Sequence, residues 1–296
     1  MQYDNLPVDE KLEIIDRMSI KDLLIFSKTS RENNILVKRR IRIIRNDLAN
    51  NGLTQQEMND ILDNEHNFFD FVNNNRINEV RVILKYFPEY INIKDFMDQT
   101  ALMIATGEGS IELVRILLEN GANVNIQDND DGHTALMTAS RRGYINIARM
   151  LIDAGADLEI KDESGDTALM YATTNSHTET VRMLLDVGAD VNTIDEINQT
   201  VLFNVSSKFP DLYQLLIDRG INVNVQESDE GQTVLMSKIE FYQQGNNNQL
   251  QIIIMLLNAG ADLNLRDRNG KTALMYANEK GNQEIIDLLL QHGATQ

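Results

Sequence analysis

The sequence contains no cysteine, only three prolines and only four histidines among its 296 residues. The absence of cysteine excludes disulfides and thiolate metal sites, and it is typical of proteins from a reducing compartment. The histidines are scattered without metal-ligand spacing, and neither a glycine-rich phosphate loop nor an H-E-x-x-H motif occurs. We therefore expect no enzymatic activity, no cofactor and no metal site.

Long apolar runs are also absent. No segment approaches the roughly 18 apolar residues that a membrane-spanning helix needs. The first residues, MQYDNLPVDEK, lack the basic start and the apolar stretch of a signal peptide. No cysteine is available for C-terminal lipidation. We expect a soluble, cytoplasmic protein that does not associate with membranes.

Positive charge is scarce outside the front of the chain. The net charge is −18; residues 1–50 hold 10 Lys and Arg against 8 Asp and Glu, and the remainder holds 17 against 37. Such a negative body repels phosphate backbones, so we expect no nucleic acid partner. Its field favours a protein partner with exposed Lys or Arg, chiefly by raising the association rate.

A short phrase recurs through most of the chain and indicates an internal repeat. It reads TALMIA, TALMTA, TALMYA, TVLFNV, TVLMSK and TALMYA, and its threonines are separated by 34, 33, 33, 33 and 39 residues. A glycine closes each of these units. The threonines are Thr100, Thr134, Thr167, Thr200, Thr233 and Thr272, and the glycines are Gly121, Gly155, Gly188, Gly220, Gly260 and Gly293.

The first full copy predicts two helices and a loop. Thr100 is placed to cap a short helix, and Gly109 ends it. In SIELVRILLEN the apolar residues recur at helical spacing, and Gly121 stands where a left-handed residue ends a helix. The tail, ANVNIQDNDDGH, is polar and turn-rich. One helix pair cannot bury its apolar face alone, so neighbouring units must stack.

These features resemble the ankyrin repeat, whose opening phrase T-P-L-H-x-A is matched here by T-A-L-M-x-A. The resemblance implies an all-α solenoid of helix–turn–helix units with projecting hairpin-like loops. We interpret the methionines that replace histidine as core packing rather than as a promiscuous binding surface. They are Met103, Met137, Met170, Met236 and Met275.

The expected repeat boundaries follow from this register. Residues 66–95 form a degenerate first unit without the opening phrase, and six units follow at 96–128, 129–162, 163–195, 196–227, 228–267 and 268–296. In the fourth, Pro210 lies near the junction of the two helices. The fifth carries the extra segment YQQGNNN, residues 242–248, which is either a binding loop or a tolerated insertion.

The acidic loop residues Asp128, Asp162, Asp195, Glu227 and Asp267 recur at equivalent positions, which indicates turn and capping chemistry rather than acid–base catalysis. The family resemblance places a target-binding surface on the loop tips and the ends of the short helices. The candidate residues are Phe96, Met97, Asp130, Asp131, His133, Arg141, Arg142, Asp166, Asn198, Asp229, Glu230, Arg268 and Lys271.

The front segment, LPVDEKLEIIDRMSIKDLL at 6–24, does not match the repeat. Pro7 can begin one helix and Ser19 can cap a second. NNILVKRRIRIIRNDL predicts a third, with a buried face, rather than a nuclear signal. Three short helices cannot bury their apolar residues internally, so these must pack on the repeats or on another protein.

The pattern of Leu-Pro, spaced apolar residues and K-D-L-L resembles the F-box over residues 5–45, with departures at Glu10, Lys11 and Asn33. The resemblance implies docking on the small adaptor subunit of a cullin–RING (SCF-type) ubiquitin ligase. The implied ligase-binding residues are Leu6, Pro7, Ile14, Ile15, Met18, Leu23, Leu24 and Phe26.

The sequence therefore predicts a three-helix F-box-like module at 1–48, a connecting helix at 49–65 that a Thr54–Glu57 capping box begins, and ankyrin repeats at 66–296. The expected function is a monomeric, non-enzymatic adaptor that brings a target to a ubiquitin ligase. This arrangement resembles proteins with which giant viruses and amoeba-infecting bacteria redirect ubiquitination in the host cytosol. The alternative is a plain ankyrin scaffold or inhibitor whose front helices only cap the repeats.

Overall fold

The computed structural model describes Pro7, Lys11 and residues 31–50, 52–54, 56–57 and 68–295, except for the side chains of 31–34. Within these residues every regular element is a helix, as predicted, and strand-like pairing is limited to isolated bridges at the loop bases. No described helix is both long and apolar enough to cross a membrane. The chain divides into two compact units, Met1–Asp130 and Asp131–Gln296.

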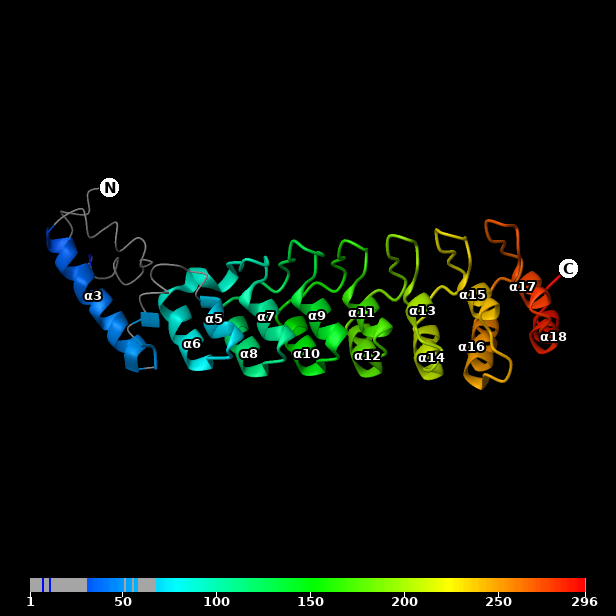
Figure 1. Cartoon of the computed structure of the whole chain (residues 1–296), viewed down its shortest axis with the longest axis horizontal. Coiled ribbons are helices and arrows are strands. Elements are labelled where there is room, and N and C mark those ends of the chain that lie inside the picture. Colours follow the sequence, from blue (N-terminus) through cyan, green and yellow to red (C-terminus); the bar gives the residue numbers. More distant parts are fainter. Residues whose placement is uncertain are drawn as a thin grey trace. The chain divides into compact units, whose positions relative to one another are not determined.

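In the first unit, two helix pairs stack beside a longer helix (Figure 1). The degenerate repeat forms a pair although it lacks the threonine phrase, because Phe68, Phe71, Val80 and Ile83 bury their side chains. The elements are α3 (Arg31–Asn50), α5 (Phe68–Asn73), α6 (Ile77–Tyr86), the 3-10 helix η3 (Pro88–Asn92), α7 (Ala101–Gly107) and α8 (Ile111–Glu119).

Helix α3 packs against α6. Val37, Ile44 and Leu48 are at most 3% exposed and lie on one face at helical spacing. Near the end of α3, Asp47 accepts hydrogen bonds from the Lys85 ammonium, at 2.7 Å, and from the Tyr86 hydroxyl. The buried face predicted for this basic helix is therefore present.

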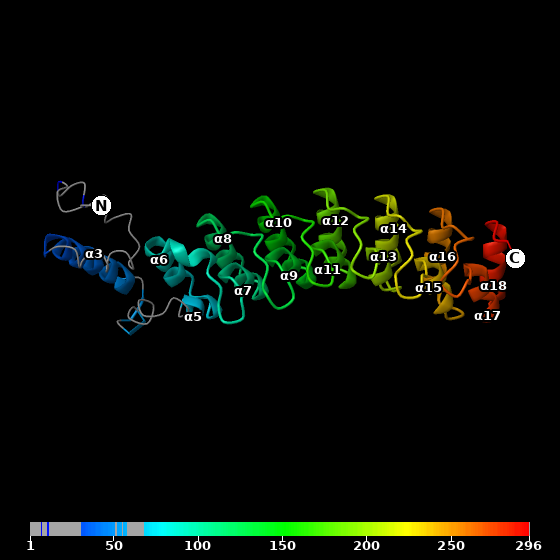
Figure 2. The same ribbon diagram turned by 90° about the horizontal axis from the view of Figure 1, so that it is seen from above.

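The second unit consists of five helix pairs. Figure 2 shows the shorter first helices in one layer and their partners in a second layer. The pairs are α9 (Ala135–Arg142) with α10 (Ile145–Asp153), α11 (Ala168–Thr174) with α12 (Thr178–Asp186), α13 (Val201–Asn204) with α14 (Pro210–Asp218), α15 (Val234–Glu240) with α16 (Asn247–Asn258), and α17 (Ala273–Glu279) with α18 (Gln283–Gln291).

The threonine phrase begins three of the short helices by a reciprocal cap, whereas Thr272 makes only half of it and Thr167 and Thr200 form no side-chain cap. The Thr100 hydroxyl accepts from the Met103 backbone N–H, and the Met103 sulfur lies 3.4 Å from the Thr100 nitrogen that donates to it. Thr134 and Thr233 form the same cap. Methionine thus takes the position that glutamate holds in a capping box, a role that the sequence reasoning missed.

Core packing is confirmed for four of the repeat methionines, which are 1–7% exposed. The prediction is wrong for Met275, which is 37% exposed. Met275 lies in the last helix pair, and no further pair of the described chain covers its outer side. Gly121 has the left-handed φ of 82° expected for a residue that ends a helix.

The fourth and fifth repeats depart from the regular pattern, as their sequences indicate. Helix α13 has only four residues, and Pro210 is the first residue of α14. In the fifth repeat, part of the extra segment forms a loop and the rest extends α16 to 12 residues. Asn246 caps α16 by accepting from the Gln249 N–H at 3.1 Å.

Candidate protein-binding surface

Five of the loops between helix pairs are tight fingers, each closed by one carboxylate. In the third repeat, Asp162 Oδ1 accepts from the backbone N–H groups of Ser164, at 2.9 Å, and Asp166, at 2.8 Å. This is the Asx type of turn. Asp195 and Asp267 bond their own loops in the same way, and Glu227 does so with its longer side chain. Turn chemistry is therefore confirmed for these four acidic residues.

In the second unit, backbone hydrogen bonds also join each finger to the next. A loop N–H donates to a loop carbonyl of the preceding repeat, so the fingers hold one another in register. The bonds run from Glu163 to Asp131 (2.9 Å), from Glu196 to Ser164 (3.0 Å), from Ser228 to Ile197 (2.8 Å) and from Arg268 to Glu230 (2.8 Å).

A tyrosine of the TALMYA phrase braces two of the fingers. The Tyr171 hydroxyl donates to Asp162 Oδ2 at 2.5 Å, and His133 Nε2 lies 2.7 Å from the same hydroxyl. In the last repeat, Tyr276 donates to Asp267 at 2.6 Å, and Gln232 donates to the Tyr276 hydroxyl at 2.8 Å. Burial, followed by the aspartate bond, raises the pKa of both tyrosines, so both stay neutral donors.

The pKa values of two carboxylates near these tyrosines are shifted in opposite directions. Burial alone would raise the pKa of Asp267, but hydrogen bonds from Tyr276 and the loop N–H groups outweigh it and lower the pKa. Burial, then Asp162 and Asp195, raise the pKa of Asp166 to about 6. Its Oδ1 atom is enclosed and has no hydrogen-bond partner. Asp166 therefore carries less negative charge near pH 6 than an ordinary surface aspartate.

Most of the predicted target-binding residues are exposed on fingers or helix ends. Phe96 is 87% and Met97 is 49% exposed at the tip of a finger in the first unit, where Asp95 closes the turn. Arg141 and Arg142 are exposed in the last turn of α9, where cations complement the helix dipole. The other exposed members are Asp130, Asp131, Asp229, Glu230 and Arg268.

Four of the predicted residues are partly buried and bonded inside the array. His133 contacts Tyr171, and Lys271 donates to Glu279 at 2.8 Å. Asn198 donates to the Gln226 carbonyl, and the backbone N–H of Asp166 donates to Asp162. These side chains support the fingers, and the exposed ones present the surface. Sequence spacing could not separate the two groups, since all of them lie in loops or at helix ends.

The predicted ligase-binding residues lie outside the described residues except for Pro7, which is exposed. The Lys11 backbone N–H donates to the Pro7 carbonyl at 3.0 Å, four residues earlier in the chain. Lys11, one of the departures from the F-box pattern, is only 2% exposed.

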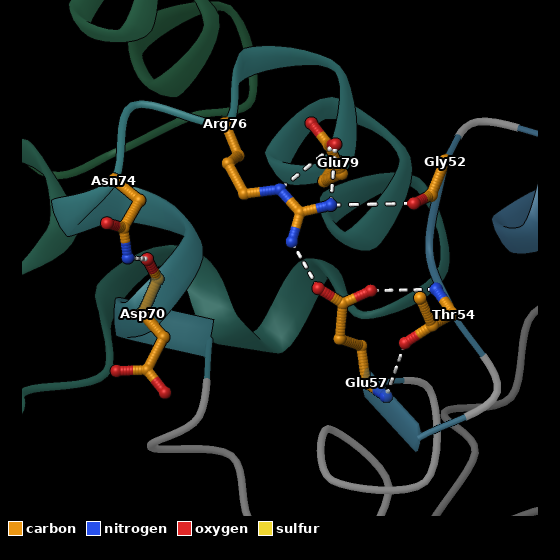
Figure 3. A network of polar contacts seen from close by, with 7 residues as sticks. All are labelled: Gly52, Thr54, Glu57, Asp70, Asn74, Arg76 and Glu79. Carbon is orange, nitrogen blue, oxygen red and sulfur yellow. Dashed lines mark hydrogen bonds and ion pairs between the residues drawn. The ribbon is translucent and has the colours of Figure 1, made fainter.

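The junction between the front segment and the repeats is held by Arg76 (Figure 3). Its guanidinium bonds the carboxylates of Glu57 and Glu79 and reaches the Gly52 carbonyl. Thr54 and Glu57 form the predicted capping box, with bonds of 2.7 and 3.2 Å. The Thr54 N–H, together with Arg76, holds the pKa of Glu57 below its usual value. Residues 52–57 are thus fastened to the first helix pair.

The described residues contain no cluster of three His, Asp or Glu side chains that could hold a metal ion. The described repeats present exposed fingers on a braced scaffold, with carboxylates engaged in turns. Such a surface offers exposed side chains for contact with a macromolecule.

Comparison with known proteins identifies both parts of the chain. The family model described as Ankyrin repeats (3 copies) matches residues 126–195 and 201–296, and the one described as Ankyrin repeats (many copies) matches 99–152. The F-box domain model matches residues 4–45.

Similar proteins include putative ankyrin repeat proteins of Acanthamoeba polyphaga mimivirus (35% identical over 26% of this chain), Treponema pallidum (40% over 27%) and Fowlpox virus (33% over 32%). The matches span only 10%, 24% and 26% of these relatives' own lengths.

Among solved structures, the ankyrin repeat domain of Bcl-3, described as a unique member of the IkappaB protein family, is 27% identical with a TM-score of 0.65. The likeness covers 75% of this chain and 97% of that one. The chain therefore belongs to the ankyrin repeat family and carries an F-box domain at residues 4–45 in front of its repeats.

Proposed function

We propose that this protein is an adaptor that brings a target protein to an SCF-type ubiquitin ligase. The F-box docks on the small adaptor subunit of the ligase, and the ankyrin fingers hold the target. The observation that carries the proposal is the presence of both modules in one chain, with an F-box match at residues 4–45 directly before the repeats. Both families are protein–protein interaction modules.

Contacts of helix α3 join the end of the F-box match to the first helix pair. Helix α3 starts inside the F-box match and ends against α6, where Asp47 bonds Lys85 and Tyr86. The Arg76 contacts fasten the connecting residues to the same helix pair. Contacts that restrict motion between the F-box and the repeats would keep a bound target close to the ligase. They raise the effective concentration of the target there, because the complex samples fewer unproductive orientations.

The target expected for the fingers is a protein with exposed Lys or Arg. Exposed finger carboxylates such as Asp131, Asp229 and Glu230 dominate the surface of the second unit, and the chain beyond residue 50 is strongly acidic. Electrostatic complementarity of this kind accelerates association and selects among partners.

Packing of α3 on α6 also favours a second candidate function. The same contact would serve a scaffold or inhibitor in which the front helices only seal the first helix pair and the fingers block a partner by occupancy. The two candidates differ in whether the F-box surface binds a ligase subunit.

Co-elution of the full chain with the purified ligase adaptor subunit and cullin in size-exclusion chromatography separates the two. We expect the wild type to co-elute and the Leu6→Ala/Pro7→Ala variant to elute alone. The Asp229→Asn/Glu230→Gln variant, changed only on a finger, is the matched control and should still co-elute. If the wild type also elutes alone, the ligase role is lost and the scaffold function stands.

A further inference from the structure

The fourth and fifth repeats, which are the two irregular repeats of the second unit, are neighbours. In each of them the irregular segment exposes side chains at the turn between the two helices. In the fourth repeat, the Tyr213 hydroxyl donates to the carbonyls of Val205, at 2.9 Å, and Leu202. These carbonyls lie at the end of α13, so the tyrosine bonds groups that a longer helix would bond itself. The following turn, closed by the Phe209 N–H on the Ser206 carbonyl at 3.1 Å, exposes Lys208 and Phe209.

Helix α15 of the fifth repeat carries a lysine where the other repeats have a small core residue. The position of Lys238 in the threonine phrase is occupied elsewhere by Ala105, Ala139, Ala172 and Ala277, all fully buried. The Lys238 ammonium lies 5.7 Å from the centroid of the Tyr213 ring of the preceding repeat. No carboxylate among the described residues forms an ion pair with it, and burial lowers the pKa of the amine.

An exposed aromatic ring follows directly after this helix. Phe241 ends α15 and is 68% exposed, and Phe209 in the neighbouring turn is 41% exposed. The extra segment of the fifth repeat does not hide Phe241, because Gln249 holds the base of that loop by bonding the Phe241 carbonyl and the Gln243 N–H. Figures 1 and 2 show α13–α14 and α15–α16 as adjacent pairs.

These features require an explanation because they oppose the character of the rest of the array. A half-buried ammonium without a carboxylate is unfavourable in the isolated chain, since it loses hydration without gaining a counter-charge. The exposed rings of Phe209, in the turn after α13, and of Phe241, three residues after Lys238, add apolar surface after the two short helices. A partner segment with a carboxylate could pair with the Lys238 ammonium, and a large apolar side chain beside it could cover the phenylalanine rings. Strongly basic segments would be repelled by Lys208 and Lys238.

We propose that Lys208, Phe209, Lys238 and Phe241 form a docking site for a short acidic segment of a partner protein, in which a carboxylate side chain stands beside a large apolar one. The carboxylate pairs with the Lys238 ammonium over the Tyr213 ring, and the apolar side chain packs between Phe209 and Phe241. The site lies at the turns between helices rather than on the fingers, and it requires no ligase.

Selection of a random peptide library on the immobilised full chain tests the proposal. Enriched peptides should combine Asp or Glu with a large apolar residue. In fluorescence titrations of the synthesised peptides, Lys238→Met and Phe241→Ser should each raise Kd roughly tenfold or more. Met is chosen at 238 because it keeps the apolar stem of lysine without its charge. Thermal melts establish that both variants fold.

The matched control is Lys280→Met, which removes an exposed lysine of the last repeat and should leave the Kd unchanged. Peptide binding should also protect Lys238, but not the exposed Lys280, from acylation as measured by mass spectrometry. The proposal is overturned if no peptide is enriched, if enriched peptides lack the acidic and apolar pair, or if folded Lys238→Met and Phe241→Ser bind them as the wild type does. Co-elution with the ligase is a separate outcome, so each proposal can fail alone.

Discussion

The finger of the third repeat, DESGDT at 162–167, and that of the sixth, DRNGKT at 267–272, have the same backbone turn and the same bracing tyrosine. They differ in what lies next to them. The third finger touches the backbone of the following one, whereas a Cβ added to the sixth at Gly270 would meet nothing within 4 Å. Substitutions at equivalent positions of two repeats can therefore change the free energy of unfolding by different amounts. The difference arises because the neighbouring residues, and not the repeat motif, determine the contacts that are lost.

The largest difference is expected at the finger glycines. A Cβ on Gly165 would lie 2.7 Å from the Glu196 backbone nitrogen, while Gly270 has open space, and both have left-handed φ angles, 81° and 77°. Alanine at either position costs about 1–2 kcal/mol for the backbone conformation. Gly165→Ala should cost about 2 kcal/mol more, because the clash is with backbone. Urea unfolding of the two variants measures this; equal losses would contradict close finger contact.

Removing the tyrosine hydroxyls should have the next largest effect. Tyr276 is 4% exposed and its hydroxyl bonds both Asp267 and Gln232. Tyr276→Phe should therefore lower the free energy of unfolding by about 2 kcal/mol. Tyr171→Phe, at a more exposed site, should cost about 1 kcal/mol. If thermal or urea unfolding shows a larger loss of stability for Tyr171→Phe than for Tyr276→Phe, burial does not determine how much each tyrosine hydrogen bond contributes.

Asp166, the residue before the threonine of the third finger, should make the stability of the protein depend on pH. Asp166 has its pKa raised from 3.8 to about 6 in the folded chain. Between these values the folded state binds more protons than the unfolded one, so this group's contribution to stability falls as pH rises from about 4 to 6.

Asp166→Asn removes that loss and should stabilise the protein by about 1 kcal/mol at pH 7, a figure reduced for partial exposure. At pH 4 the variant should equal the wild type. Urea unfolding at both pH values checks this, with the exposed Asp229→Asn as control. A gain at pH 4 as large as that at pH 7 would show that ionisation of Asp166 is not the cause.

Lys271, at the same position in the sixth finger, should matter least. It forms an exposed ion pair with Glu279, 2.8 Å apart, and such pairs contribute little. Lys271→Gln should leave the melting temperature unchanged within error. A clear destabilisation would mean that the contact of the Lys271 ammonium with the Tyr276 ring, 5.2 Å from the centroid, stabilises the finger more than the hydrogen bonds of Tyr276 do.

Local rules predicted the helical elements well because they depend on neighbours in sequence. Thr100 caps its helix and Pro210 begins one, and Asp162 closes its finger. These are contacts between residues two to four positions apart, which a one-dimensional pattern contains. The sulfur contact in the threonine cap was missed, since methionine is not among the residues that usually complete a capping box.

The candidate surface was less predictable, because exposure depends on which repeat packs next to which. Phe96 and His133 both occupy finger positions, but Phe96 is open and His133 bonds Tyr171. The tyrosine in the fourth position after the repeat threonine was the available signal, since it occurs in only two of the six phrases. One partner of each tyrosine, His133 or Gln232, comes from the preceding repeat, and sequence alone does not provide the distance to it.

The sequence by itself determined the repeat, its period and its two irregular units, because stacking of identical helix pairs imposes a periodic pattern on apolar residues. It also determined the acidic balance of the array and the distinct front segment. Only the tertiary structure decided which acidic side chains are internal turn ligands and which are exposed. It also placed Lys238 over Tyr213 without a carboxylate, since burial and pairing are properties of residues distant in the chain.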